Sequence, residues 1–191
     1  MTGMDPASDT IVLDAELAYA DVLPIRWTPL EAELDVERAA ALIDQNLRVL
    51  QTFAAMEDSA QVEKPDEDSP HSADLQRIEF KVNLLLDLVG RILAREQPVP
   101  ELLPIRFNAR GARWQARGAT PVAGSHGVLE IHLRESLLQP LRMPGRVAAV
   151  EAGRHVKVDF DAVGEPVADI IEKLAFRRHR RQVAKGRSRP A

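Results

Sequence analysis

The sequence contains no cysteine, which excludes disulfide bonds, thiolate metal sites and cysteine nucleophiles. The absence of cysteine also suits a reducing cytoplasm. No stretch approaches the ~20 consecutive apolar residues that a membrane-spanning helix needs. The opening residues, 1–8, are polar and acidic, unlike the basic start and apolar run of a signal peptide. We therefore expect a soluble, cytoplasmic protein that has no contact with a membrane.

Motifs typical of enzymes and metal sites are missing as well. The histidines show no metal-ligand spacing, and there is no HExxH sequence or paired-carboxylate cluster. A phosphate-binding P-loop and a GxSxG nucleophile turn are also lacking. The sequence therefore predicts no catalytic residue, no metal site and no bound cofactor, and it favours a protein without catalysis.

Charge is unevenly distributed along the 191 residues, whose formal net charge is −4. From Lys173 onwards there are eight basic residues and no acidic one. The rest of the chain keeps 17 basic residues against 29 acidic ones, a net charge of −12. An acidic body with a basic tail favours contacts of the tail with another subunit or with an anionic partner.

The first half of the chain predicts two long helices. A helix start is indicated by Thr28-Pro29-Leu30-Glu31, where Thr28 can cap, Pro29 suits the first helical position and Glu31 completes a capping box. An acidic segment with two prolines, residues 58–72, reads as a linker, and Gln97-Pro98 ends the second helix. Apolar residues follow heptad spacing in both helices. They are Val36, Ala40, Ile43, Leu47 and Leu50 in the first helix and Leu75, Ile78, Val82, Leu85, Val89 and Ile92 in the second.

These heptad residues suit either an antiparallel hairpin within one chain or self-association between chains. Both helices carry further apolar residues, among them Phe53 and Leu84, so their apolar surface is too wide for a simple hairpin. A β-domain of the same chain could cover part of it. We interpret the heptad residues as an oligomerisation surface.

From Leu102 onwards the pattern changes to short strands. Leu129, Ile131 and Leu133 alternate with polar residues, and Val156 and Val158 repeat the pattern. Glycine and proline turn signals separate these segments, which indicates a small antiparallel sheet or barrel. A last helix is expected from Pro166. The fold class is therefore α+β.

The order of these segments resembles the PilZ domain. The resemblance rests on the segments 108–114, 128–133, 144–150 and 156–160, followed by a closing helix that ends in arginines. The upstream segment 19–27 and the two heptad helices are similar to an atypical PilZ subgroup, in which an inserted long helix drives tetramer formation. The resemblance implies a six-stranded antiparallel barrel in a bacterial receptor family for cyclic di-GMP, linked to motility, surface attachment or virulence.

The expected organisation follows from this resemblance. We expect a partly disordered lead segment over residues 1–27, the two oligomerisation helices over 28–97, the PilZ-like barrel with its closing helix over 98–182, and a disordered basic tail over 183–191. The resemblance also implies a homo-oligomer, by analogy a tetramer, that acts on a protein partner which the sequence does not identify.

The nucleotide-binding motifs of ordinary PilZ receptors are only partly present. An RxxxR motif usually precedes the first barrel strand, but in this chain the RxxxR string, Arg91 to Arg95, falls inside the second predicted helix. The [D/N]xSxxG motif aligns best from Arg106 to Gly111, with Asn108 in place of serine and Arg106 in place of the acid. We therefore expect weak or no cyclic di-GMP binding. Candidate nucleotide-binding residues, should another set of arginines hold the ligand, are Arg106, Asn108, Arg110, Gly111, Arg177, Arg178 and Arg181.

The basic tail has three interpretations. Its arginines could favour a helix C-terminus, dock on an acidic neighbouring subunit, or bind an anionic partner such as a nucleotide phosphate or nucleic acid. Nucleic acid is disfavoured because only Phe176 lies near the arginines and the acidic body repels phosphate.

Overall fold

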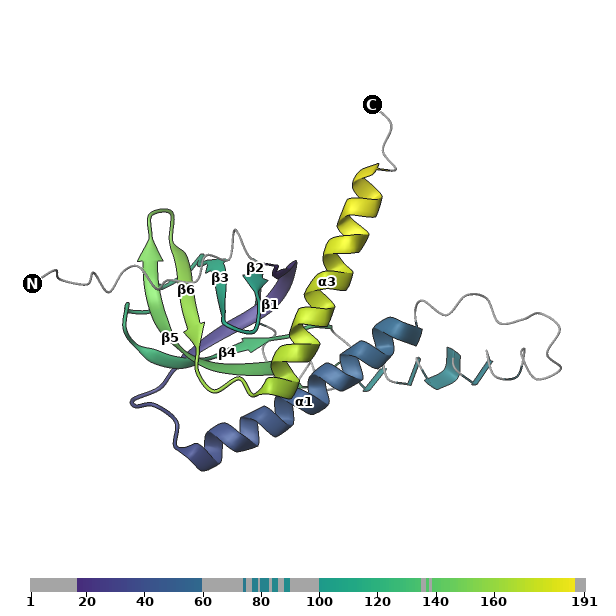
Figure 1. The fold of residues 1–191 in the computed structure, drawn as a ribbon, viewed down its shortest axis with the longest axis horizontal. Helices are drawn as coiled ribbons and strands as arrows, with labels where there is room; N and C mark the ends of the chain where they lie inside the picture. The colour runs from purple at the N-terminus through teal and green to yellow at the C-terminus, as the bar shows by residue number, and fades with distance from the viewer. Residues whose placement is uncertain are drawn as a thin grey trace, which may run out of the picture.

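The fold is a β-barrel flanked by helices (Figure 1). In this computed structural model, the described residues are 17–59, 74, 77, 78, 80–82, 84, 85, 88, 89, 100–134, 137 and 139–187.

Six antiparallel strands close into the barrel in the order β1-β2-β3-β6-β5-β4. The strands are β1 (Tyr19–Pro29), β2 (Glu101–Phe107), β3 (Gly111–Gln115), β4 (His126–Ile131), β5 (Leu141–Glu151) and β6 (His155–Phe160). Alternate residues point inward, so that Leu129, Ile131 and Val156 are fully buried. The α+β fold class and the six-stranded barrel are confirmed.

The expected helix start at Thr28 is wrong, because Thr28 and Pro29 form the end of β1. There they pair with Val128 and Gly127 of β4. The first barrel strand thus begins within the expected lead segment and ends two residues beyond it, and the barrel does not begin at residue 98. Proline is tolerated at this position because the ladder hydrogen bond to β4 is made by the next residue, whose N–H donates to the carbonyl of His126 at 2.9 Å, so the N–H that proline lacks is not required.

The first helix, α1 (Val36–Ser59), starts seven residues later than expected, at a different cap. The Asp35 carboxylate accepts a hydrogen bond of 2.8 Å from the backbone N–H of Arg38, as an N-cap residue does. The helix also continues through Ser59, past the expected start of the linker at residue 58.

The apolar side of α1 packs within the monomer, against β5 and the last helix. Val49, Leu50 and Phe53 belong to the hydrophobic core that the barrel residues form. Asn46 fixes the helix on β5 because its side chain bonds both the N–H and the C=O of Arg142, at 2.8 and 2.7 Å. The expected role of Leu50 in oligomerisation is therefore wrong, since this side chain is fully buried in its own chain.

The other expected oligomerisation residues of α1 differ in burial. Ile43 and Leu47 are half-buried and pack on the core, whereas Val36 and Ala40 are exposed. The heptad spacing of α1 thus reflects contacts with the barrel and the last helix more than a surface for another subunit.

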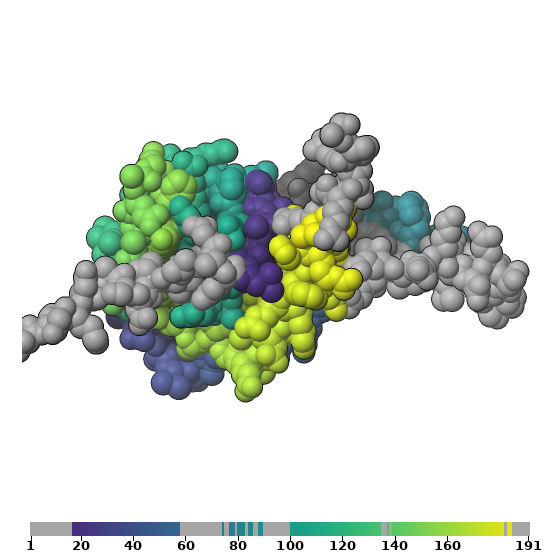
Figure 2. All heavy atoms as spheres, turned by 45° about the horizontal axis from the view of Figure 1, so that its top comes forward, coloured from purple at the N-terminus to yellow at the C-terminus, as the bar shows by residue number. Residues whose placement is uncertain are grey.

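The last helix, α3 (Glu165–Arg187), lies against α1 and β1 (Figure 2). Gly164, with a φ of 68°, leads into it, and a Cβ at this position would lie 2.9 Å from Ile43. Val167 and Ile171 are fully buried on the inner face of the helix. The tail expected to be disordered from residue 183 is instead helical through Arg187, since α3 continues over these residues despite Gly186. Residues 188–191 lie outside the described residues.

The described residues between 74 and 89 are helical, as expected, and we call them the second helix. Figure 1 places them beside and beyond the C-terminal end of α1, away from the barrel. Of the expected heptad residues, Ile78, Val82, Leu85 and Val89 are exposed. Leu75 and Ile92 lie outside the described residues.

Candidate functional site

The turn between β2 and β3 contains the degenerate motif, and Asn108 holds its shape. The Asn108 Oδ1 accepts hydrogen bonds from the backbone N–H groups of Arg110 and Gly111, at 2.8 and 3.1 Å. The Asn108 N–H in turn donates to the Gly111 carbonyl at 3.0 Å. Because Asn108 is buried and its Oδ1 accepts from the turn's own backbone, its role in the structure is to form the turn.

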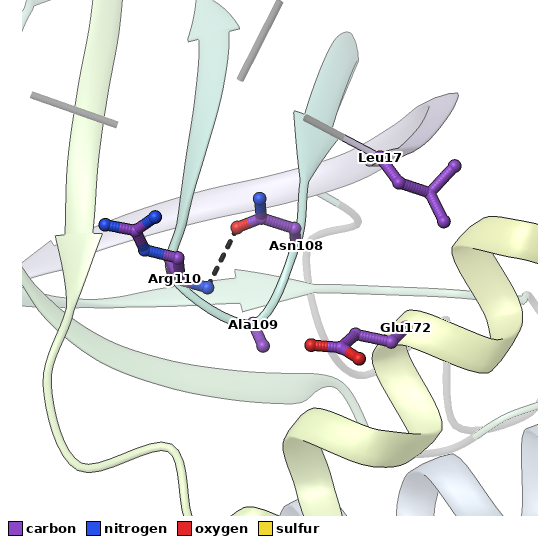
Figure 3. A pocket seen from close by; sticks show the side chains of 5 residues that line it. All are labelled: Leu17, Asn108, Ala109, Arg110 and Glu172. Carbon is purple, nitrogen blue, oxygen red and sulfur yellow. Dashed lines mark hydrogen bonds between the residues drawn. The ribbon is translucent and has the colours of Figure 1, made fainter. Parts of the chain in front are cut away.

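A hollow of about 240 Å³ lies between this turn and α3 (Figure 3). We call it the hairpin hollow; its lining residues are Leu17, Asn108, Ala109, Arg110 and Glu172. Figure 3 shows the Glu172 carboxylate directed toward Ala109, whereas the Arg110 side chain extends away from Glu172. A carboxylate in this position disfavours a phosphate in the hollow.

The register of the barrel places three basic residues side by side across its outer face. Arg106 on β2 is opposite Arg113 on β3, and Arg113 is opposite Lys157 on β6. We call Arg106, Arg113 and Lys157 the basic row. Glu151 accepts ion pairs from Lys157 at 2.6 Å and from Arg113 at 3.5 Å. The hydrogen bond from Lys157, together with both positive charges, lowers the pKa of the Glu151 carboxyl.

The sequence pattern indicated Arg106 as a candidate but did not indicate Arg113 or Lys157. Strand pairing brings these two residues beside Arg106 although they are distant in sequence. In the sequence, Arg113 and Lys157 stand only at polar positions of two alternating strands. Such positions do not reveal which strands are neighbours in the barrel.

Two of the candidate arginines of the tail are engaged within the chain. Arg178 pairs with Asp21 of β1 at 2.5 Å, and its guanidinium lies 5.6 Å from the centroid of the Tyr19 ring. Arg181 pairs with Glu57 of α1 at 2.5 Å. These contacts link α3 to both β1 and α1, so the arginines help to fix the helix on the body.

Aromatic contacts surround this junction of β1, β2, α1 and α3. The Tyr19 ring centroid lies 5.3 Å from that of Phe107 and 6.5 Å from that of Phe53. Burial raises the pKa of Tyr19 to about 12, although the charge of Arg178 acts in the opposite direction. Since Tyr19 pairs with Phe107, the junction and the turn at Asn108 lie at the same end of the barrel.

A second hollow, of about 480 Å³, lies at the opposite end of the β2–β3 hairpin. Apolar groups form most of its walls, including Trp27 and Trp114, whose ring centroids are 6.2 Å apart. Its charged lining residues, Glu101 and Arg117, pair with each other at 3.5 Å.

The second helix exposes two separate apolar faces. At about 100° per residue, Ile78, Val82, Leu85 and Val89 fall in a sector of about 60°. We call these four residues the seam face. Another set, Phe80, Leu84 and Leu88, is centred about 130° away around the helix and forms the second apolar face. All seven side chains are exposed, with 61% of Leu85 and 68% of Phe80 accessible.

Metal sites and membrane-spanning helices are absent from the described part of the chain. Among these residues, no group of three or more histidine, aspartate or glutamate side chains is placed to hold a metal ion. Within the same residues, every helix is too short or too polar to cross a membrane.

Comparisons with known proteins agree with this architecture. A family model described as "Atypical PilZ domain, cyclic di-GMP receptor" matches residues 50–188. Among solved structures, a pathogenic protein from Xanthomonas campestris matches with a TM-score of 0.66 and 23% sequence identity, over 93% of this chain and 92% of the other. That protein is described as a tetrameric PilZ domain self-assembled via an unusual helical bundle. A comparison with curated protein sequences finds no match.

Proposed function

Because the chain belongs to the atypical PilZ domain family, we propose that it is a non-catalytic, homo-oligomeric protein of cyclic di-GMP signalling that acts through protein contacts. The observation that carries this proposal is the second helix with its two exposed apolar faces. In this proposal the helices assemble the subunits, and the barrel presents a surface to a partner protein.

The two apolar faces support an assembly of more than two helices. A helix that forms a simple pair needs one apolar stripe, whereas a helix inside a bundle contacts neighbours on two sides. The seam face and the second apolar face are about 130° apart, which suits two neighbours. The Xanthomonas campestris protein, which is described as a tetramer formed through a helical bundle, supports four subunits.

Weak or absent cyclic di-GMP binding by the isolated barrel is part of the same proposal. β1 is the first barrel strand, and residues 1–18, which precede it, contain no arginine or lysine. Asn108 forms the turn, while Arg178 and Arg181 are paired with carboxylates of the chain itself. A nucleotide phosphate would therefore have to displace Asp21 or Glu57 to reach these two arginines.

The proposal is tested by changing the seam face and measuring the mass in solution by light scattering. Leu85→Asp introduces a charge on the seam face, which would be buried without a partner in a bundle, so we expect the oligomer to dissociate. Val122→Asp is the matched control, because it also replaces an exposed apolar side chain by a carboxylate but lies outside the second helix. If Leu85→Asp retains the mass of the unmodified chain, the seam face is not the assembly surface.

A second candidate function, a genuine cyclic di-GMP receptor, is favoured by the basic row. Arginine side chains can bind phosphates in a bidentate manner and stack on guanine rings, and lysine adds a further positive charge. In this candidate Arg106 and Arg113 take the place of the missing RxxxR motif, with Arg110 close to them at the turn. A calorimetric titration with cyclic di-GMP tests this candidate. Saturable binding that is lost in Arg113→Ala and kept in Arg117→Ala, two residues after the end of β3, would establish it.

A further inference from the structure

The outer face of α3 combines apolar and basic side chains. Lys173, Phe176, Arg180 and Val183 fall within a sector of about 80° around the helix, opposite the face that carries the buried residues. We call these four residues the α3 outer face. Phe176 is 52% accessible and Val183 is 41% accessible, and both basic side chains are exposed.

The basic side chains of the α3 outer face are not paired with any described residue, although Asp169 lies on the same side of α3 one turn before Lys173. Arg178 and Arg181, on the inner side, pair with Asp21 and Glu57. In the described part of the chain, neither Lys173 nor Arg180 forms an ion pair. No acidic residue follows Glu172 in the sequence. From Lys173 onwards the outer face is thus a positively charged surface with two apolar side chains, on a helix whose end rises away from α1 and from the barrel (Figure 1).

A surface of opposite charge precedes and begins α1. We call residues 31–37 the acidic segment; its exposed carboxylates are Glu31, Glu33, Asp35 and Glu37. Val36 lies among them with 87% of its side chain accessible. Arg38 offsets one of these charges because it pairs with Asp35 at 3.5 Å. The acidic segment therefore offers three further carboxylates around an exposed apolar side chain.

The two surfaces cannot meet within one molecule. Figure 1 shows the start of α1 and the end of α3 at opposite sides of the structure. α3 is held in this position by its buried residues and by the pairs of Arg178 and Arg181. Each chain thus carries both halves of a complementary contact that only another molecule can complete.

We propose that the α3 outer face of one copy docks on the acidic segment of a second copy. In this contact Lys173 and Arg180 face the carboxylates of Glu33 and Glu37, and Val36 packs against Phe176 and Val183. Opposite charges favour encounter and fix register, and the apolar side chains contribute burial. The contact is heterologous, since different surfaces meet, and it involves no residue of the second helix.

Cysteine cross-linking tests this contact on the full chain, which has no cysteine of its own. A Val36→Cys chain is mixed with a Val183→Cys chain and treated with a short bismaleimide, and the linked peptides are identified by mass spectrometry. We expect links between positions 36 and 183, and none when Val36→Cys is mixed with Val122→Cys. The control position suits this comparison because Val122 is 75% accessible and lies outside both surfaces.

Charge reversal then tests the cause of the contact. Lys173→Glu with Arg180→Glu in the Val183→Cys chain should reduce the 36–183 link to the level of the control. Glu33→Lys with Glu37→Lys in the Val36→Cys chain should restore it. The two docked copies are subunits of one helical assembly, so this test rests on the proposed function, and the mass by light scattering should stay unchanged because the second helix is intact. Absence of the 36–183 link, or a link that persists after charge reversal on one side, overturns the proposal without affecting the helical assembly.

Discussion

Replacing Asn108 by alanine tests whether this residue of the degenerate motif is structural. The change removes the Oδ1 acceptor from two backbone N–H groups, of which the one of Gly111 is buried and the one of Arg110 is partly buried. A buried donor left without a partner costs about 1–3 kcal/mol, and loss of a bond that water can replace costs about 0.5–1.5 kcal/mol. We therefore expect Asn108→Ala to lower the free energy of unfolding by about 2–4 kcal/mol.

Urea denaturation followed by circular dichroism measures this loss. With a slope of about 2 kcal/mol per molar urea, the midpoint should fall by about 1–2 M while the slope stays constant. Gln115→Ala is the matched control in the same hairpin, because it removes an exposed side-chain hydrogen bond of 3.0 Å to the Gly153 carbonyl. A midpoint for Asn108→Ala equal to that of this control would refute the structural role of Asn108.

Two further predictions concern the core and the pH dependence of stability. Leu50→Ala should lower the free energy of unfolding by about 2–5 kcal/mol, whereas Val36→Ala, in the same expected heptad, should change it by less than about 0.5 kcal/mol in urea denaturation. Equal losses for the two variants would show that α1 does not pack on the barrel. Burial lowers the pKa of His132 below its ordinary value of 6.5, so the unfolded chain takes up a proton first as pH falls. The contribution of His132 to stability is complete above 6.5 and is lost as pH falls from there through the lower pKa of the folded state. An NMR titration of the imidazole should therefore give a midpoint below 6.5, and a midpoint above 6.5 would show that the carboxylate of Glu130 outweighs burial.

Period-two patterns in the sequence predicted the later strands well, and the first strand was missed. Leu129 and Val156 point into the barrel and alternate with polar residues along their strands. Alternation with a period of two is typical of a half-buried strand. In β1 the inward residues Leu23 and Ile25 follow the same period. The sequence Thr28-Pro29-Leu30-Glu31 nevertheless satisfied the rules for a helix start. Such rules consider only neighbouring residues, whereas pairing with the distant strand β4 makes Thr28 and Pro29 part of a strand.

The heptad spacing in α1 shows a different limit of sequence patterns. Spacing identifies an apolar face but not the surface that covers it, and in α1 the barrel covers Leu50. The second helix has the same spacing and leaves Leu85 exposed. Only the three-dimensional structure separates these two cases, because the difference lies in what packs against each helix.

Much of the candidate site depends on cross-strand register and on tertiary ion pairs. Arg113 and Lys157 come together with Arg106 through the pairing of three strands. The engagement of Arg178 by Asp21 joins residues at opposite ends of the sequence. The resemblance to the atypical PilZ family, by contrast, rested on element order, and the family match confirms it.

The mass of the unmodified chain in solution tests the central claim most directly. Light scattering coupled to gel filtration measures the mass of the assembly. Calorimetric titration of cyclic di-GMP into the same sample then measures ligand binding. We predict a mass about four times that of the 21.2 kDa chain and little or no heat of nucleotide binding. A mass of 21.2 kDa would contradict the assembly that the two apolar faces of the second helix support.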